Sequence, residues 1–431
     1  MTATAERTAT KERVDDPIAT RVDRLVQSDR VHGSMYTDEE IFQAELERIW
    51  YGSWVFVGHE SEVAKPNDFV RKTVGLQDVV MTRDSSGEVH LVVNRCAHRG
   101  ATICEGRRGN SSSFRCPYHG WTFKNDGSLI GYPYYQGYGA RGELRLNMGT
   151  ARVGIHEGFV FATFNPDSPS LTEYLGHAAG ELERLTRLSP SGELDISTGW
   201  LKHRTNCNWK LVMENETDGY HPQFTHGSIF SVTGSPIGAL YGEKSTAVTR
   251  DLGGGHAEND LRPEFRKFAE PMRWFGSSAS KVPDYLEAMR DRHRDAAEEV
   301  LIDGAPHLVV FPNLFIAEIT IFMIQPLSVG RCVQYSTPVQ FKGAPTMNRR
   351  LLSQSIGSVG PSGMLLADDA DMYERNQRGV EMLQPEWLDL SRGLHRESID
   401  DRGLLIGASN DETGMRAFWK QYRHLMKREE S

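Results

Sequence analysis

Residues 96–121, CAHRGATICEGRRGNSSSFRCPYHGW, contain two cysteines and two histidines spaced as ligands of a metal centre. Cys96 and His98 form a Cys-x-His pair, and after seventeen intervening residues Cys116 and His119 form a Cys-x-x-His pair. Two thiolates and two imidazoles in this arrangement fit a [2Fe–2S] cluster in which the cysteines bind one iron and the histidines bind the other. The stretch therefore predicts an iron–sulfur domain.

A tetrahedral zinc site is the alternative for the same four side chains, because zinc also binds two cysteines and two histidines. In zinc fingers the two cysteines lie together and the two histidines lie together, whereas here each pair contributes one of each. Gly100, Gly120 and Trp121 also fit two tight loops that close over a cluster. The pattern favours a Rieske cluster, whose histidine ligands raise its potential above that of an all-cysteine ferredoxin.

Length and composition limit the classes of protein that this chain can belong to. Its 431 residues are too many for one core and suit two or three domains. The net charge of −9 provides no basic stripe for nucleic acid, and no apolar run reaches the ~18 residues needed to cross a membrane. The polar N-terminus lacks the apolar centre of a secretory signal. We therefore expect a cytoplasmic protein.

The cysteines agree with a reducing compartment. Two of the five are assigned to the cluster, which leaves Cys104, Cys207 and Cys332 scattered along the chain. A disulfide framework would be denser and even in number.

The pattern of apolar residues and turn signals divides the chain into four segments. Residues 1–35 are expected to be a mobile arm, and residues 36–53 a helix that packs with the domain at 171–431. Residues 54–165, with short β segments such as 79–82 and 89–92 around a turn, form an all-β domain. Residues 171–431 form an α+β domain, an antiparallel sheet with helices on one side.

Helices are predicted at both ends of this second domain. Residues 171–188 are expected to form one helix at its start. Residues 409–412 cap a final helix whose apolar stripe consists of Met415, Phe418, Trp419, Tyr422 and Leu425.

A second metal site is indicated by His221 and His226. They are five positions apart, so they converge only if their helix bends or breaks. Two imidazoles and one carboxylate on one face of Fe(II) leave positions open for O₂, as in non-haem oxygenases. An acidic stretch downstream offers the carboxylate, although acidic residues are also common at a helix start. Its candidates are Asp368, Asp369, Asp371 and Glu374.

From Tyr36 to the C-terminal helix, the chain resembles the large (α) subunit of the Rieske non-haem iron aromatic ring-hydroxylating oxygenases. The cluster motif, the NWK…EN…DxYH…H segment at 208–226 and the GPSG…DD segment at 360–369 occur in the family's order. The resemblance implies an α+β chain, in which an all-β Rieske [2Fe–2S] domain precedes a helix-grip catalytic domain.

The resemblance also implies roles for particular residues. Alignment on residues 360–363 favours Asp369 over Asp368 as the third iron ligand, and Asp218 matches a bridging carboxylate. In the family's head-to-tail trimer, the cluster of one subunit lies beside the iron of the next, so Asp218 would join His221 to the neighbour's His119. The implied ligands are Cys96, His98, Cys116 and His119 for the cluster, and His221, His226 and Asp369 for the iron.

The substrate pocket and the electron source are less well defined. By position, Phe230, Val359 and Leu365 line the pocket, although each also suits an ordinary core. Residues 137–142 satisfy GxGxxG but lack the strand–turn–helix unit of a dinucleotide site, so no nucleotide site is expected. Electrons from NAD(P)H would then arrive through a separate flavin reductase, with or without a ferredoxin.

The expected function is that of the terminal oxygenase in a multicomponent Rieske system, adding both atoms of O₂ to a substituted monocyclic aromatic acid or amine. A monooxygenase or demethylase on the same scaffold is the alternative. A Rieske electron carrier or redox sensor is a more distant one, since it would not need His221, His226 and Asp369. The expected assembly is a homotrimer or an α₃β₃ complex with a small β subunit.

Overall fold

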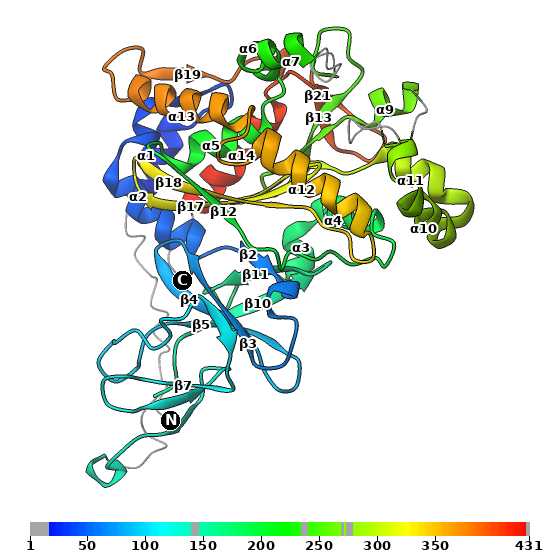
Figure 1. The fold of residues 1–431 in the computed structure, drawn as a ribbon. Helices are drawn as coiled ribbons and strands as arrows, with labels where there is room; N and C mark the ends of the chain where they lie inside the picture. Colours follow the sequence, from blue (N-terminus) through cyan, green and yellow to red (C-terminus); the bar gives the residue numbers. More distant parts are fainter. Residues whose placement is uncertain (1–16, 139–145, 234–239, 269–270, 273–278, 428–431) are drawn as a thin grey trace, which may run out of the picture.

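The computed structural model describes residues 17–138, 146–233, 240–268, 271–272 and 279–427. Two bodies are visible in Figure 1, a β-rich one drawn mostly in cyan and a larger one in which helices surround a long sheet. The α+β class predicted from the sequence is confirmed. None of the described helices is long and apolar enough to cross a bilayer.

The smaller body is an antiparallel sheet that, within the described residues, has seven strands. The predicted hairpin is present, because Val79 to Arg83 pair with Val93 to Val89 across a turn in which Asp84 accepts from the backbone of Ser86 and Glu88. The strands, in sheet order, are β2 (Val55–His59), β11 (Phe159–Thr163), β10 (Thr150–His156), β5 (Val89–Val93), β4 (Gln77–Arg83), β3 (Asp68–Val74) and β6 (Arg108–Asn110).

A small sheet of β7 (Ser113–Arg115), β8 (Thr122–Lys124) and β9 (Leu129–Gly131) extends this body. One predicted cluster loop follows β5 and the other joins β7 to β8. Phe114, Trp121 and Phe123 are buried beneath both loops in one apolar cluster that includes Cys96 and Cys116. The loops are therefore held on a common core although they are distant in sequence.

The larger body is built on an antiparallel sheet with nine strands among the described residues. Because side chains alternate across a strand, Phe315 and Phe322 face one side and pack with Met213, while Ile316 and Ile321 face the other and pack with helix residues such as Leu185. The strands, in sheet order, are β12 (Leu201–Thr205), β18 (Arg331–Pro338), β17 (Thr320–Ser328), β16 (Leu314–Ala317), β15 (His307–Val310), β14 (His256–Asp260), β13 (Val248–Gly253), β21 (Leu405–Ala408) and β20 (Ser398–Ile399).

Helices pack against both faces of this sheet rather than on the one side predicted, with α5 and α14 on one face and α4 on the other (Figure 1). The helix predicted at 171–188 is two helices, because Gly176 adopts a positive φ of 48° between them and ends the first. The described helices of this body are α3 (Leu171–Leu175), α4 (Ala178–Arg187), α5 (Trp209–Thr217), α6 (Pro222–Thr225), α7 (Gly227–Thr233), α9 (Arg262–Phe268), α10 (Pro283–His293), α11 (Ala297–Asp303), α12 (Pro345–Val359), α13 (Leu366–Val380) and α14 (Thr413–Met426).

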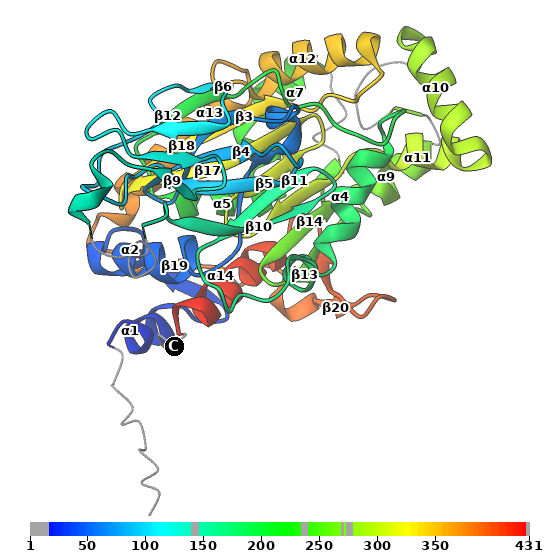
Figure 2. The ribbon, with the colours of Figure 1, turned by 90° about the horizontal axis from the view of Figure 1, so that it is seen from below.

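The N-terminal segment differs from the prediction of a mobile arm at 1–35. Its described part forms α1 (Pro17–Leu25), β1 (Arg30–His32) and a 3-10 turn, η1 (Gly33–Tyr36). β1 pairs with β19 (Trp387–Asp389), and α1 lies beside α14 (Figure 2), with Asp23 accepting from Arg423. Val22 and Val31 are fully buried. A few apolar residues dispersed among charged ones supply this packing, so the composition alone does not reveal it.

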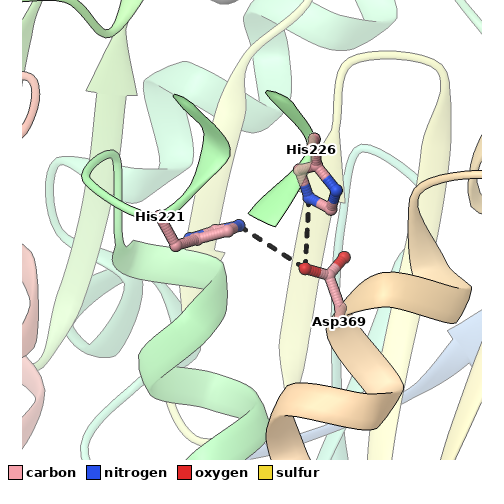
Figure 3. A group of neighbouring side chains, drawn as sticks. All are labelled: His221, His226 and Asp369. Atoms are coloured by element: carbon pink, nitrogen blue, oxygen red, sulfur yellow. Dashed lines mark ion pairs between the residues drawn. The ribbon is translucent and has the colours of Figure 1, made fainter. Parts of the chain in front are cut away.

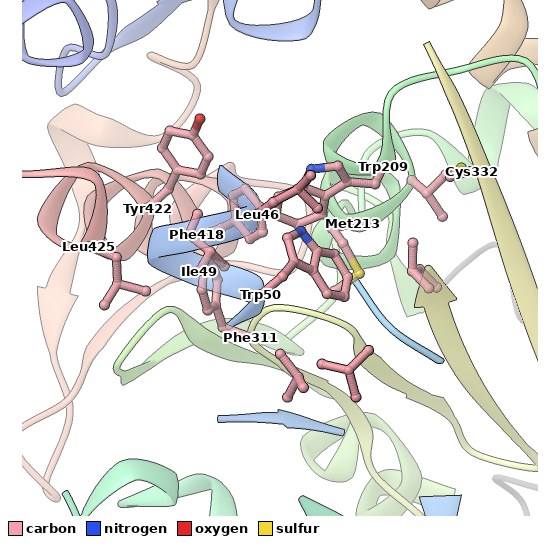
Figure 4. Packing of buried hydrophobic residues seen from close by; sticks show 14 of the residues in the cluster. Leu46, Ile49, Trp50, Trp209, Met213, Phe311, Cys332, Phe418, Tyr422 and Leu425 are labelled. Carbon is pink, nitrogen blue, oxygen red and sulfur yellow. The ribbon is translucent and has the colours of Figure 1, made fainter. Parts of the chain in front are cut away.

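A buried ion pair joins the next helix to α5. α2 (Glu39–Glu45) continues as a π-helical turn, η2 (Leu46–Trp50), and its Glu45 accepts from the ammonium of Lys210 on α5. Both side chains are fully buried. Glu45 also accepts from Trp209 Nε1 at 2.7 Å and from the Tyr422 hydroxyl at 2.6 Å. Figure 4 shows the aromatic core that contains Trp50, Trp209 and Tyr422. The Trp50 and Trp209 rings meet there edge to face, with their centroids 5.3 Å apart.

Replacing Glu45 with alanine is expected to lower the free energy of unfolding by about 3–5 kcal/mol, because it leaves the Lys210 ammonium buried without a partner. Urea denaturation followed by tryptophan fluorescence measures this change. Glu193→Ala is the control, because it breaks the exposed Glu193–Lys342 pair, and its expected cost is below about 1 kcal/mol. Equal losses in the two variants would contradict the prediction.

Candidate metal centres

The two cluster loops have the same backbone geometry. Gly100 N donates to Cys96 O at 2.9 Å, and Gly120 N donates to Cys116 O at 3.0 Å. Both glycines have positive φ values, 75° and 73°, a region that side chains disfavour and glycine adopts readily. Each loop therefore turns back immediately after its cysteine and directs a cysteine and a histidine to the same side.

The four predicted cluster ligands are brought together, and both thiols and His98 Nδ1 are buried, this nitrogen without a hydrogen-bond partner. Cys96 and Cys116 are each 2% exposed and their thiols are within hydrogen-bonding reach of one another, while His119 lies on the surface. The His98 and His119 ring centroids are 4.6 Å apart, and the Trp121 ring stacks on His98 at 4.8 Å. These donors fit a [2Fe–2S] cluster in which Cys96 and Cys116 would hold one iron and His98 and His119 the other.

The pKa values of two of these groups are shifted. Burial raises the pKa of the Cys96 thiol, and the nearby Cys116 thiol raises it further. Desolvation, together with the charges of His119 and Arg99, lowers the pKa of His98. A neutral His98 is the form that binds a metal, whereas the buried thiols need a positive centre to become thiolates. The site is thus suited to a cationic group.

The second group of ligands forms where helix α5 ends. The chain leaves α5 at Asp218 and passes His221 before the four-residue helix α6, and His226 follows that helix. Because helix α6 is so short and starts at Pro222, the two histidines are not held on one regular helix, and their ring centroids are 5.4 Å apart. This break resolves the five-residue spacing that a regular helix would not accommodate.

Asp369, in the first turn of α13, completes this group (Figure 3). One ligand atom from each of His221, His226 and Asp369 lies within 4.8 Å of the others. Asp369 Oδ1 is 3.5 Å from His221 Nε2 and 3.1 Å from His226 Nε2. This oxygen is buried yet makes no well-aligned hydrogen bond, as expected for an atom whose partner is a metal ion. The set could hold Fe(II).

The neighbouring carboxylate lies differently. Asp368 Oδ2 is 3.5 Å from the other ring nitrogen of His226, Nδ1, and its side chain is 39% exposed against 12% for Asp369. Burial lowers the pKa of His226, but the carboxylates of Asp369 and Asp368 outweigh burial and leave it above its ordinary value. The geometry therefore favours Asp369 as the ligand and gives Asp368 the outer position.

Asp218 contacts His221 at the ring nitrogen that does not face Asp369. Its Oδ2 lies 3.3 Å from His221 Nδ1, and its Oδ1 accepts from the backbone N–H of Tyr220. His221 thus presents Nδ1 to Asp218 and Nε2 to Asp369, an arrangement that orients the ring for metal binding.

The three predicted pocket residues lie at different places relative to the proposed iron ligands. The Phe230 ring centroid lies 6.1 Å from that of His226, and Leu365 O accepts from Asp369 N at 3.2 Å. Val359 is the last residue of α12 and packs against the core. Of the GxGxxG stretch, residues 139–142 lie outside the described residues.

Sequence reasoning missed a polar group behind Asp369. Glu216, Gln334 and Tyr373 are buried together there, from a helix, a strand and a second helix. Glu216 and Gln334 are 118 positions apart in the sequence, and Gln334 and Tyr373 are 39 apart. No sequence pattern connects them, and only the fold brings them together.

Comparison with known protein families gives two matches. The Rieske [2Fe-2S] domain matches residues 53–141, and the ring hydroxylating alpha subunit (catalytic domain) matches residues 193–428.

The relatives include large subunits of dioxygenases. That of 2-halobenzoate 1,2-dioxygenase from Burkholderia cepacia is 29% identical over 417 residues, 92% of this chain and 88% of the relative. That of anthranilate 1,2-dioxygenase from Acinetobacter baylyi is 30% identical over 383 residues, 85% of this chain and 81% of the relative. A structure of naphthalene 1,2-dioxygenase with indole bound has a TM-score of 0.80 at 26% identity, covering 94% of each chain.

The fold and its two groups of metal-binding side chains define a two-centre iron oxidoreductase. The chain belongs to the ring-hydroxylating dioxygenase alpha subunits, with a Rieske domain before the catalytic domain. Its cofactors are accordingly a Rieske [2Fe–2S] cluster and a mononuclear non-haem iron, and it serves as the terminal oxygenase of a Rieske system.

Replacing Asp369 with alanine is expected to remove the mononuclear iron, so that the iron content falls from about three to about two per chain while the cluster absorbance persists. Iron analysis and the visible spectrum of the purified protein measure both. Asp368→Ala is the matched control and should keep the third iron. The reverse result, loss with Asp368→Ala and retention with Asp369→Ala, would assign the ligand to Asp368.

Proposed function

We propose that this oxygenase dihydroxylates a substituted monocyclic aromatic acid or amine. The observation that carries the proposal is the grouping of His221, His226 and Asp369, within 4.8 Å of one another, in a chain related to such enzymes. The substrate class rests on the relatives, whose names include 2-halobenzoate, anthranilate and toluate 1,2-dioxygenase.

In this proposal, His221, His226 and Asp369 hold the iron, and Cys96, Cys116, His98 and His119 hold the cluster. When bound, the cluster supplies single electrons and the iron supplies the site at which O₂ is activated. The protein's part is orientation. Asp218 Oδ2 lies 3.3 Å from His221 Nδ1, so this carboxylate would hold the ring with its Nε2 turned toward the metal.

A head-to-tail trimer is part of the proposal, because the two centres of one chain lie at opposite ends. Figure 1 shows β7, at the cluster end, far from α6 and α13. Exposed aromatic side chains occur at both ends, with Tyr118 66% exposed beside His119 and Phe224 70% exposed near His221. Bringing these ends together would bury both and place the partner subunit's His119 against Asp218.

The remaining partners follow from the same proposal. Relatives are named as large oxygenase components of a system, so we expect a separate flavin reductase, with or without a ferredoxin, to deliver electrons from NAD(P)H. An α₃β₃ assembly with a small β subunit is the alternative to the homotrimer. A cytoplasmic location is supported by the five cysteines, all of which are free and buried.

A single-turnover assay with pre-reduced protein and ¹⁸O₂ tests this function. Benzoates, salicylates, anthranilates and anilines are added in turn, and cluster reoxidation is followed by absorbance and the product by mass. Two ¹⁸O atoms in one product are expected from dihydroxylation. Reoxidation that no member of the panel accelerates, with no labelled product, would refute the proposed substrate class.

One observation favours a second candidate, oxidative N-demethylation. An N,N-dimethyl phenylurea N-demethylase subunit alpha from Sphingobium is 35% identical over 218 residues, half of this chain and 47% of that one. Hydroxylation of an N-methyl group inserts one oxygen atom and releases formaldehyde. With an N,N-dimethyl phenylurea added to the panel, release of formaldehyde and a product that has lost one methyl group would favour this candidate.

Replacing Asp218 with asparagine is expected to keep both metals and abolish coupled turnover, because the amide cannot accept from both histidines that the carboxylate joins. Metal content and product formed per electron consumed measure the two effects separately. Asp371→Asn, which removes an exposed carboxylate paired with Arg375, is the control and should turn over normally. Normal coupling in the Asp218 variant would rule out the bridging role.

A further inference from the structure

Glu216 is a buried carboxyl group beside the iron ligands that the proposed mechanism does not use. It lies on α5, two residues before Asp218, and only 8% of its surface is exposed. Its Oε1 accepts from Gln334 Nε2 on β18 at 2.9 Å, and it shares a hydrogen bond with Tyr373 on α13. Gln334 and Tyr373 are each 1% exposed, so water does not substitute for these contacts.

Tyr373 connects this carboxyl group to an iron ligand. It follows Asp369 by four residues on α13, which places the two side chains on the same face of the helix. A second residue of α5 holds it as well, since Asn215 Nδ2 donates to the Tyr373 hydroxyl at 3.3 Å. Helix α5, which leads to His221, is thereby joined to the helix that carries Asp369.

Burial and the nearby Asp369 carboxylate disfavour a negative charge on Glu216 or on Tyr373. Burial raises the pKa of Glu216 well above its ordinary value, and the nearby Asp369 carboxylate raises it further. Burial, Glu216 and Asp369 likewise raise the pKa of Tyr373. Burial and the Asp369 carboxylate therefore both favour the neutral form of Glu216, and a glutamine could reproduce its hydrogen bonds.

We propose that Glu216 is a positioning residue of the mononuclear iron site, which holds Asp369 at the distance required by His221 and His226 through its hydrogen bonds to Tyr373 and Gln334. The inference rests on the proposed iron ligands. The contact between α5 and α13 would thereby set the geometry of the iron ligands. Hydrogen-bonded partners behind the ligands of a metal commonly affect its affinity by about 10–100-fold.

The test is Fe(II) affinity rather than turnover. The full-length protein, with its cluster intact and its mononuclear iron removed by anaerobic chelation, is titrated with Fe(II) against a competing chelator. Glu216→Leu removes both hydrogen bonds and is expected to weaken Fe(II) binding about tenfold or more. Glu216→Gln keeps them and should bind within about twofold of the unmodified chain. The EPR spectrum of the Fe(II)–nitric oxide adduct should broaden only in the leucine variant.

Glu214→Gln is the matched control. Glu214 is also buried on α5 but bonds Tyr36 and Trp419 instead of Tyr373, so Fe(II) affinity should not change. If Glu216→Leu does not fold, Tyr373→Phe removes the hydroxyl alone and should weaken Fe(II) binding in the same direction.

Two results would overturn the role of Glu216. One is unchanged Fe(II) affinity in the leucine variant, or in Tyr373→Phe if the leucine variant does not fold. The other is an equal loss in the glutamine and leucine variants. Failure of the proposed function is recognised separately, because the unmodified chain would then bind no third iron.

Discussion

The buried ion pair between Lys210 and Glu45 fixes the helix on which the catalytic half is organised. An ammonium group without a partner in that interior would be strongly destabilising, so α5 cannot shift along its axis without losing the carboxylate of α2. The same helix supports the iron site from its other end, where it runs into Asp218 and His221. Its position is therefore constrained by charge on one side and by the geometry of metal ligands on the other.

The two centres were predictable to different degrees. The cluster loops are local, because each cysteine, its histidine and the glycine that turns the chain lie within five residues, so spacing alone carried the information. The proposed iron site includes Asp369, which lies 143 residues beyond His226, and only the resemblance to a family selected it from four acidic candidates. Glu216 had no such support, since its neighbours Gln334 and Tyr373 are assembled by the sheet and by α13.

The errors had physical causes as well. Gly176 divides a segment whose apolar periodicity is continuous, because a positive φ ends a helix whatever the pattern of its neighbours. The segment at 17–35 is rich in charged residues, yet Val22 and Val31 are buried and Asp23 pairs with Arg423. In both places a single tertiary contact or backbone angle outweighed the average composition on which the prediction depended.

The pairing of the first described helix with the last has a consequence for the order in which the protein is made. Asp23 binds Arg423 and Lys427, some 400 residues later in the chain. The ribosome releases the N-terminal helix long before its partner exists, whereas strands β2 to β11 are complete by Thr163. The strands of the iron–sulfur body are thus complete early, but the face of their sheet that shares an apolar cluster with α5 and α14 is covered only after α14 has emerged. In the meantime the apolar face of α1 stays uncovered, exposed to chaperones and proteases.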